Sequence, residues 1–490
     1  MPIPVRLTIL LGCAVLPTLR AQSLNDYEPQ VREVVLNTDV TQITPKSGPP
    51  YTVTGGVFVF RNVKISAGVT VRGTGTRPML WLVTGDFQLD GELTVRGENA
   101  PHVDTLNSAN FPSPGGRGNC SGGNGGAGSV SPVGPDPTGQ PGFGSGQYPA
   151  AGGAGGLMSC NPNCGRGSGG GGGAYATQGD PWYPTKSSGT SFLQQLGSGG
   201  PGCLGASGSA SRTLPGGNAG ARPFTDNIPG NDFFGLAYDV FRNRLIAGEL
   251  GGLHGGTGGG GGGDRSVAHL CPPLANPNWI LDNKGAGGGG GGGVVVICAL
   301  GRILIGTAGR LTADGGDGGG GEPAGSNNQG GGGGGGSGGM VILWSQTHVE
   351  VATHGETFAN RDYSFAISAD GGICRQGAFG GTLIAAKYPP PPSGALWDAT
   401  PTGGMGGLGV VQFITLPGAN ADGTNTVLDD NIHIVQNNVR LVGAHKQRYL
   451  AWRGFPDAQG AWVDDLGNPT NIGDREGDIR PTPILLPLLK

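Results

Sequence analysis

The sequence predicts a mainly β protein: a right-handed parallel β-helix, or solenoid, with polyglycine-II-like segments and long loop insertions. Three observations predict this class. The chain holds 105 glycines among 490 residues, far more than an ordinary globular domain. Short β-branched runs lie between the glycines, and such runs are typical of buried strands. One strand–turn–strand pattern also repeats along the chain, which indicates a solenoid.

The N-terminal residues predict export. Residues 1–22 combine a positive charge at Arg6, an apolar stretch at Leu7–Leu16 and a small residue at Ala21. This combination is the pattern of a secretory signal peptide. The residues before Cys13 also resemble a lipoprotein cleavage box, so a lipid anchor on this cysteine is the alternative. We expect a secreted or cell-surface protein.

Charge and hydropathy argue against a nucleic-acid partner and against a transmembrane segment. The formal net charge is −4 and the sequence pI is about 6.0, so the chain lacks the basic character typical of nucleic-acid binding. After the leader, no apolar run is long enough to cross a bilayer. We therefore expect neither a nucleic-acid partner nor a transmembrane segment.

An internal repeat predicts the solenoid. Residues 23–50 are expected to lead into a first block at 51–100. In this block Asn62–Gly73 aligns with Asp86–Gly97, and both copies end in Thr-Val-Arg-Gly. Each copy holds two apolar alternations joined by a glycine turn, which reads as a strand, a turn and a second strand. Stacking such units buries a continuous core that no single unit can close.

A long insertion separates this block from later units. Residues 101–293 are rich in glycine, serine, proline and asparagine, and they contain one aromatic island, Asp232–Phe241. We expect the island to anchor the insertion on the scaffold; a binding surface is the alternative. Residues 417–490 are predicted to form a small β module or tail. The repeated pattern returns twice within residues 294–416, at Ile303–Gly315 and His348–Gly355.

Uninterrupted glycine runs, such as Gly258–Gly263 and Gly287–Gly293, need a separate explanation. A glycine run buries no side chain and loses the most conformational entropy on folding, so on its own it is a flexible linker. In the extended three-fold helix every backbone polar group points outward, and glycine lets neighbouring segments approach closely enough to bond to one another. Because the runs recur beside predicted strands, we expect a polyglycine bundle placed on the β scaffold. A disordered linker is the alternative.

Cysteines in the glycine-rich insertion predict disulfides. In an oxidising compartment Cys120, Cys160, Cys164 and Cys203 could form two bridges, whose pairing the sequence does not determine. The close pair Cys160 and Cys164 would also suit zinc, but no second pair follows at the usual spacing. Cys298 lies in an apolar run and is expected to be a buried free thiol.

Two acidic turns are the candidate calcium sites. Short turns rich in oxygen atoms can supply the hard ligands that calcium prefers. The candidate ligands are Asp314 and Asp317 in one turn and Asp422, Asp429 and Asp430 in the other. Neither turn matches the EF-hand spacing or the nonapeptide of calcium-binding β-rolls. No other cofactor is expected.

No catalytic motif stands out. The GxGxxG matches follow from the glycine content, and the GxSxG match around Ser337 precedes a strand, which does not fit a nucleophile elbow. We therefore do not expect an enzyme. The alternative is a polysaccharide lyase or hydrolase, which needs carboxylates and a basic residue on neighbouring units. Its candidate residues, for which the alignment places the two arginines side by side, are Asp86, Asp90, Glu92, Arg72 and Arg96.

Glycine runs that lead into apolar strands resemble a class of bacterial glycine-rich exported proteins. The resemblance is carried by Val294–Gly301 and Ser337–Leu343, with Ala313–Glu322 between them, and it covers roughly Tyr51–Gln412. The glycine architecture is also similar to polyglycine-bearing phage tail adhesins and to the glycine-rich domain of anaplastic lymphoma kinase receptors. These similarities imply a polyglycine bundle used in recognition and carry over no individual residue. Gly423–Asp430 resembles the end of a Calx-beta repeat.

Together these features predict an exported structural or adhesive protein of the cell surface, a matrix or a fibre. Such a protein would present loops on a rigid scaffold to a polysaccharide or another cell-surface component, and it could self-assemble. One alternative is a polysaccharide-degrading enzyme on the same scaffold. The other is a mostly disordered glycine-rich coat.

Overall fold

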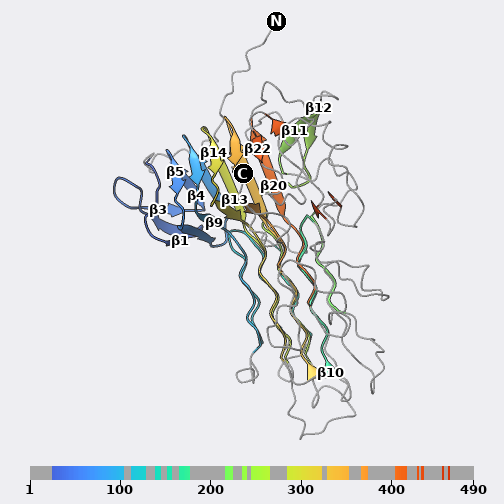
Figure 1. Ribbon diagram of the computed structural model, residues 1–490. Coiled ribbons are helices and arrows are strands. Elements are labelled where there is room, and N and C mark those ends of the chain that lie inside the picture. The colour runs from blue at the N-terminus through green and yellow to red at the C-terminus, as the bar shows by residue number, and fades with distance from the viewer. Residues whose placement is uncertain are drawn as a thin grey trace.

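Strands dominate the part of the chain that the computed structural model describes. The described residues are 25–103, 112–128, 138–144, 152–156, 165–176, 216–223, 234–239, 244–264, 284–322, 328–352, 366–372, 403–415, 427–429, 432–434, 455–456 and 462–463. None of these residues belongs to a helix. Most of the strands lie in parallel sheets (Figure 1), so the predicted mainly β class is confirmed.

Three parallel sheets form the scaffold. In spatial order, the first sheet contains β20 (Val410–Thr415), β17 (Met340–Ser345), β13 (Val294–Ala299), β7 (Met79–Val83) and β4 (Val57–Phe60). The second contains β22 (Ile432–Ile434), β18 (Val349–Val351), β14 (Ile303–Ile305), β8 (Phe87–Leu89) and β5 (Val63–Ile65), with β21 (Val427–Asp429) added antiparallel to β22. The third contains β1 (Glu33–Asn37), β6 (Thr70–Thr74), β9 (Glu92–Thr94), β15 (Arg310–Thr312) and β19 (Ile367–Ser368).

The chain visits these sheets in turn. Strands β4, β5 and β6 contribute one strand to each sheet, and β7 to β9, β13 to β15 and β17 to β19 repeat that order. Successive passes stack in register: Val63 pairs with Phe87, and Phe87 pairs with Ile303. Strand β13 pairs with β7 although the long insertion separates them in sequence. The insertion therefore leaves the scaffold after β9 and returns at β13 without interrupting the stack.

Apolar side chains from all three sheets form one core between them. The alternation of buried and exposed residues, as in Val63-Lys64-Ile65, directs every second side chain inward. Aromatic residues fill the N-terminal part, where Trp81 is fully buried. Its ring lies 5.3 Å from that of Phe58 and 5.8 Å from that of Phe87, measured between centroids. Burial of these rings removes a large apolar area from water, which favours folding.

The N-terminal end of the core is closed by residues before β4. Tyr27 bridges to Val63 and stacks on Phe60 at 4.8 Å. The antiparallel hairpin of β2 (Val40–Ile43) and β3 (Tyr51–Thr54) adds the buried side chains of Ile43 and Val53. A closed end shields the unpaired edge of a stacked scaffold from other chains.

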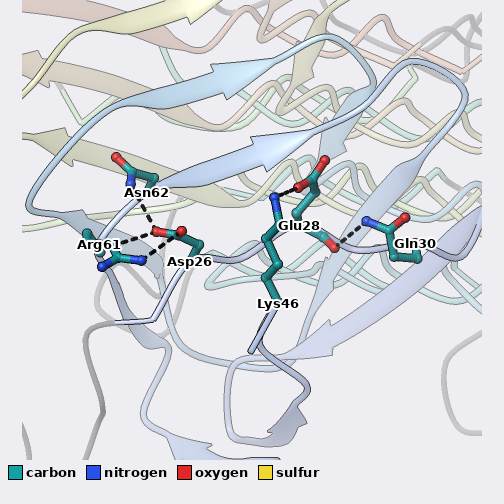
Figure 2. A network of polar contacts seen from close by, with 6 residues as sticks. All are labelled: Asp26, Glu28, Gln30, Lys46, Arg61 and Asn62. Atoms are coloured by element: carbon teal, nitrogen blue, oxygen red, sulfur yellow. Dashed lines mark hydrogen bonds and ion pairs between the residues drawn. The ribbon is translucent and has the colours of Figure 1, made fainter. Parts of the chain in front are cut away.

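A polar network holds this end in place (Figure 2). The carboxylate of Asp26 accepts two hydrogen bonds from Arg61, both at 2.9 Å, and one from Asn62 at 2.9 Å. These bonds, led by that of the Arg61 guanidinium, lower the pKa of Asp26 to about 2. Nearby, Lys46 forms an ion pair with Glu28. The segment before β1 is therefore tied both to the β4–β5 corner and to the residues that follow β2.

The register in the third sheet differs from that of the sequence alignment. The alignment is confirmed between β5 and β8, but Arg72 of β6 pairs with Thr94 of β9, not with Arg96. The turn Ser66–Val69 is two residues longer than the turn Asp90–Gly91, and this difference shifts β6 relative to β9. The expected juxtaposition of the two arginines is therefore wrong.

Strands also occur outside the two predicted blocks of the scaffold. Strand β1 lies in the expected lead-in, residues 23–50, and pairs in parallel with β6. Strand β22 lies in residues 417–490 and pairs in parallel with β18. The remaining described strands form short separate pairs: β10 (Gly165–Arg166) with β16 (Asn328–Gln329), β11 (Leu236–Asp239) with β12 (Arg244–Ala247), and β23 (Phe455–Pro456) with β24 (Trp462–Val463).

Candidate functional site

Glycine-rich segments leave the scaffold together and run side by side toward β10 (Figure 1). We call them the glycine bundle, which comprises the described residues 112–128, 138–144, 152–156, 167–174, 216–220, 255–264, 284–293, 313–322, 330–339, 369–372 and 403–409. The bundle is the largest feature of the described chain outside the three sheets. It is therefore the first place to look for a functional surface.

Backbone hydrogen bonds of the run before β13 follow a period of three residues. Every third N–H group donates to a backbone carbonyl of the same neighbouring segment, at 2.7–3.0 Å. Gly288 donates to Gly126 and Gly291 to Gly123 of one segment, and Gly289 donates to Gly334 and Gly292 to Ser337 of a second. Gly290 donates to Glu98 and Gly293 to Val95 of a third. A β-strand would alternate between two directions instead. These N–H groups are therefore shared among three different neighbours.

Carbonyl groups of the same run bind further segments. Gly289 and Gly292 accept from Gly259 and Gly256, Gly287 and Gly290 accept from Gly319 and Gly316, and Gly288 accepts from Gly116. The run is thus surrounded on all sides by other glycine-rich segments. Its buried backbone groups are satisfied laterally, which removes the cost that a buried unpaired glycine run would carry.

Close approach of the backbones explains why these positions are glycine. A Cβ atom added at Gly289 would lie within 3.0 Å of the Gly316 carbonyl oxygen, and one added at Gly291 would meet the carbonyl oxygen of Gly256 in the same way. Cβ atoms in proteins do not reach such distances from backbone atoms. Alanine at these positions would force the segments apart and break their hydrogen bonds.

Position in the bundle explains which segments are pure glycine. Gly258–Gly263 and Gly287–Gly293 lie inside and are buried throughout. Outer segments repeat two glycines and a third residue, as in Gly115-Gly116-Arg117 and Gly122-Gly123-Asn124, and both third residues are exposed. With a three-residue period, the third position of an outer segment faces away from the bundle. Outer segments can therefore carry side chains, whereas inner ones carry almost none.

Buried polar side chains connect neighbouring segments of the bundle close to where β17 begins. The Thr257 hydroxyl donates to the Ala174 carbonyl and accepts from its N–H, both at 2.9 Å, and Ser337 Oγ accepts from the Thr257 N–H at 2.7 Å. The Tyr175 hydroxyl donates to the carbonyl oxygen of His254 at 2.9 Å. Ser337, the central residue of the GxSxG match, thus takes part in the packing between segments.

Acidification is expected to destabilise the protein at His254, next to these bundle segments. Burial lowers the pKa of His254 to about 4, from an ordinary value of 6.5. Because the folded state favours the neutral imidazole, its contribution is complete above pH 6.5 and is lost as the pH falls toward 4. Between pH 7 and pH 5, urea denaturation should show a loss of about 2 kcal/mol in the free energy of unfolding from this group. In His254→Gln that component should be missing, and an identical pH dependence in both proteins would contradict the assignment.

The residues proposed for a polysaccharide-degrading site are dispersed. Arg72 forms an ion pair with Glu33 at 3.5 Å, and Arg96 forms one with Asp317 at 3.5 Å. The other three engage separate neighbours: Asp86 pairs with Arg302 at 3.1 Å, Asp90 accepts from Gln88 at 2.6 Å and Glu92 accepts from Thr70 at 3.4 Å. Three of the five charges are thus held in ion pairs and the other two carboxylates in hydrogen bonds to neutral side chains, and the structure does not bring the carboxylates to a common point.

The calcium candidates are also placed apart where the structure describes them. Asp317 faces Arg96, and the carboxylate of Asp314 accepts a hydrogen bond from the Asp370 N–H at 2.7 Å. Within the described residues, no cluster of three or more histidine, cysteine, aspartate or glutamate side chains could hold a metal ion. Asp429 ends β21, of which only the backbone is described, whereas Asp422 and Asp430 lie outside the described residues.

The described cysteines are free thiols. Cys120 is fully buried, and burial raises the pKa of its thiol well above the ordinary range, which makes the thiol unreactive. Cys298 is free and half-buried in β13. Cys120, one of the four cysteines expected in disulfides, therefore forms no disulfide in this structure. Cys160, Cys164 and Cys203 lie outside the described residues, so any disulfide among them stays a prediction.

In the described part of the aromatic island, Phe234 anchors the insertion, as expected. Phe234 is buried against the main core. Its N–H donates to the side-chain oxygen of Gln412 in β20, and its carbonyl accepts from the side-chain nitrogen of the same glutamine, both at 3.3 Å. A glutamine on the outer side of the first sheet therefore holds the insertion against that sheet.

Comparisons with protein-family models, curated proteins and solved structures find no match to this chain. The described part of the chain also contains no helix long and apolar enough to cross a membrane.

Proposed function

We propose that the chain is an exported structural or adhesive protein, active at the cell surface, in a matrix or in a fibre. In this proposal the three sheets form a right-handed parallel β-helix, and the bundle consists of polyglycine-II helices. The stacking of successive passes in register supports the first part. The three-residue period of the hydrogen bonds supports the second, because the extended three-fold helix has that period.

The observation that carries the function is the bundle itself. Glycine-rich segments from many parts of the chain are held together by lateral hydrogen bonds, which gives a rigid body with few side chains inside. Such a body provides no interior site for chemistry but presents an extended surface. The charges on the sheets are dispersed and paired. This arrangement argues for a structural or adhesive role over a degrading enzyme, because catalysis at a polysaccharide requires converging carboxylates.

Export follows from the leader and from the low charge of the chain. We propose that residues 1–22 are removed during secretion, and that the partners are polysaccharides, other cell-surface components or further copies of the same chain. The glycine runs in this proposal are ordered. A disordered coat would instead expose their backbone groups to water.

One experiment tests the function. Purified protein from residue 23 onward is mixed with insoluble cellulose, chitin, starch, cross-linked polygalacturonate and chitosan beads. Its self-assembly is followed by sedimentation. The proposal expects retention on a polysaccharide, sedimenting assemblies, or both, with no release of new reducing ends. Release of reducing ends would instead identify a degrading enzyme. The absence of both retention and assembly would contradict an adhesive or structural role.

A further inference from the structure

Phe143 is an exposed aromatic residue on the outer side of the glycine bundle. Its relative exposure is 54%, which is unusual for a large apolar side chain on an ordered segment. The residues on either side of it in sequence are Gly142 and Gly144, so no adjacent side chain covers the ring. An aromatic face left open in this way is a surface for stacking.

Three neighbouring segments hold the backbone around this ring. The Phe143 N–H donates to the Asn124 carbonyl at 2.8 Å, and the Phe143 carbonyl accepts from Gly258 at 2.9 Å. On the other side, the Gly142 N–H donates to the carbonyl of Gly153 at 2.8 Å. Because the backbone is fixed before any partner arrives, binding would cost little ordering entropy at this position.

Two exposed amide side chains accompany the ring. Asn124 lies opposite Phe143, and its Oδ1 accepts a hydrogen bond from the Gly118 N–H at 2.9 Å, which orients the amide and leaves its NH₂ group as a donor. Gln140 precedes Phe143 by one three-residue period, so both side chains lie on the outward side, about 9 Å apart along the segment. The backbone N–H of Gln140 donates to the Ala127 carbonyl at 2.8 Å. We call Asn124, Gln140 and Phe143 the Phe143 patch.

The patch carries no charge. Residues 122–128 and 138–144, which form it, contain no aspartate, glutamate, lysine, arginine or histidine. An acidic polysaccharide or a nucleic acid would require cations here. A hydrophobic protein partner would require a contiguous apolar area, whereas this patch has one ring flanked by amides.

We propose that the Phe143 patch binds a neutral polysaccharide. The polarised C–H groups on one face of a sugar ring match the negative face of an aromatic ring. Amide side chains supply both donors and acceptors for the hydroxyl groups at the edge of the sugar. The outward spacing of Gln140 and Phe143 places an amide and a ring along one direction, which suits an extended chain of sugars. This inference rests on the adhesive function proposed above and names its ligand class.

Retention of purified protein on insoluble cellulose, chitin and starch tests the inference. Wild-type protein should be retained on at least one of these neutral polymers, and Phe143→Ala should weaken the apparent affinity by about tenfold or more. Asn124→Ala should weaken it less. The matched control is Leu300→Ala, which removes another exposed apolar side chain, 42% exposed, from the scaffold. Melting temperatures of Phe143→Ala and Leu300→Ala should equal that of the wild type, because neither Phe143 nor Leu300 is buried.

Each outcome separates the patch from the broader function. Equal retention of wild-type and Phe143→Ala protein would overturn the patch while leaving an adhesive role intact. Retention only on polygalacturonate or chitosan would also overturn the patch without contradicting the proposed function. Self-assembly without retention would have the same two consequences. Equal losses in Phe143→Ala and Leu300→Ala would indicate unspecific apolar adsorption and would also overturn the proposal. Absence of both retention and assembly would contradict the patch and the proposed function together.

Discussion

Replacing Gly289, Gly290, Gly291 and Gly292 together by alanine is expected to abolish cooperative folding. Each new Cβ atom would lie within 3.0 Å of a backbone atom of a different segment. Relieving one such overlap costs about 1–3 kcal/mol, so four adjacent overlaps would remove most of the 5–15 kcal/mol that typically stabilises a domain. Thermal unfolding followed by circular dichroism measures the effect.

Gly251→Ala is the matched control for this variant. A Cβ atom at Gly251 meets nothing within 4 Å, and the backbone there has no positive φ angle. Its melting temperature should stay within a degree or two of the wild type or rise slightly, because alanine reduces the entropy of the unfolded chain. If the quadruple variant behaved like Gly251→Ala, the run would be a linker and the bundle would be refuted.

Trp81→Ala is expected to destabilise the scaffold by about 3–5 kcal/mol, the usual loss for a buried tryptophan. The Trp81 ring is fully buried and contacts four other aromatic rings, with centroid distances of 5.3–5.8 Å: Phe58, Tyr27, Phe60 and Phe87. Its removal would leave a cavity where the first two passes meet the N-terminal closure. The midpoint of urea unfolding, read by circular dichroism, measures the change.

Trp81→Phe distinguishes packing from the polar atom of the indole ring. Among the described residues, Trp81 Nε1 has no hydrogen-bond partner. Phenylalanine keeps an aromatic ring at the centre and removes this unpaired N–H group, so the loss should be much smaller than for alanine. Equal losses in the two variants would show that the indole makes a specific contact that the structure does not reveal.

The sequence predicted strands and stacking better than it predicted register. Glycine-bounded β-branched runs such as Val294–Ala299 were recognisable as strands, and the alignment of Val63 with Phe87 was confirmed. The register of β6 against β9 could not be predicted by this pattern. A shift of two residues keeps every side chain on the same face, so the hydrophobic alternation fits both registers equally well.

The sequence predicted that the glycine runs are ordered, but it could not predict which segments surround each run. A run such as Gly287–Gly293 has no side chain that could specify a partner, so its surroundings follow from where the flanking strands place it. The outward-facing positions of the bundle do have a signal in the sequence, which is a pattern and not a motif. Two glycines followed by a third residue, as around Arg117 and Asn124, mark positions that face outward. Phe143 follows the same logic, because it lies one period after Gln140 on an outer segment.

Amide hydrogen exchange in Gly287–Gly293 tests most directly whether the glycine runs are ordered by lateral hydrogen bonds. The structure gives the N–H groups of Gly288 to Gly293 a carbonyl partner each. Their exchange should therefore be slowed to an extent comparable with the amides of β13, since both would open only with the fold. Exchange at the rate of an unstructured peptide, beside a protected β13, would show that the run is a flexible linker and would contradict the bundle.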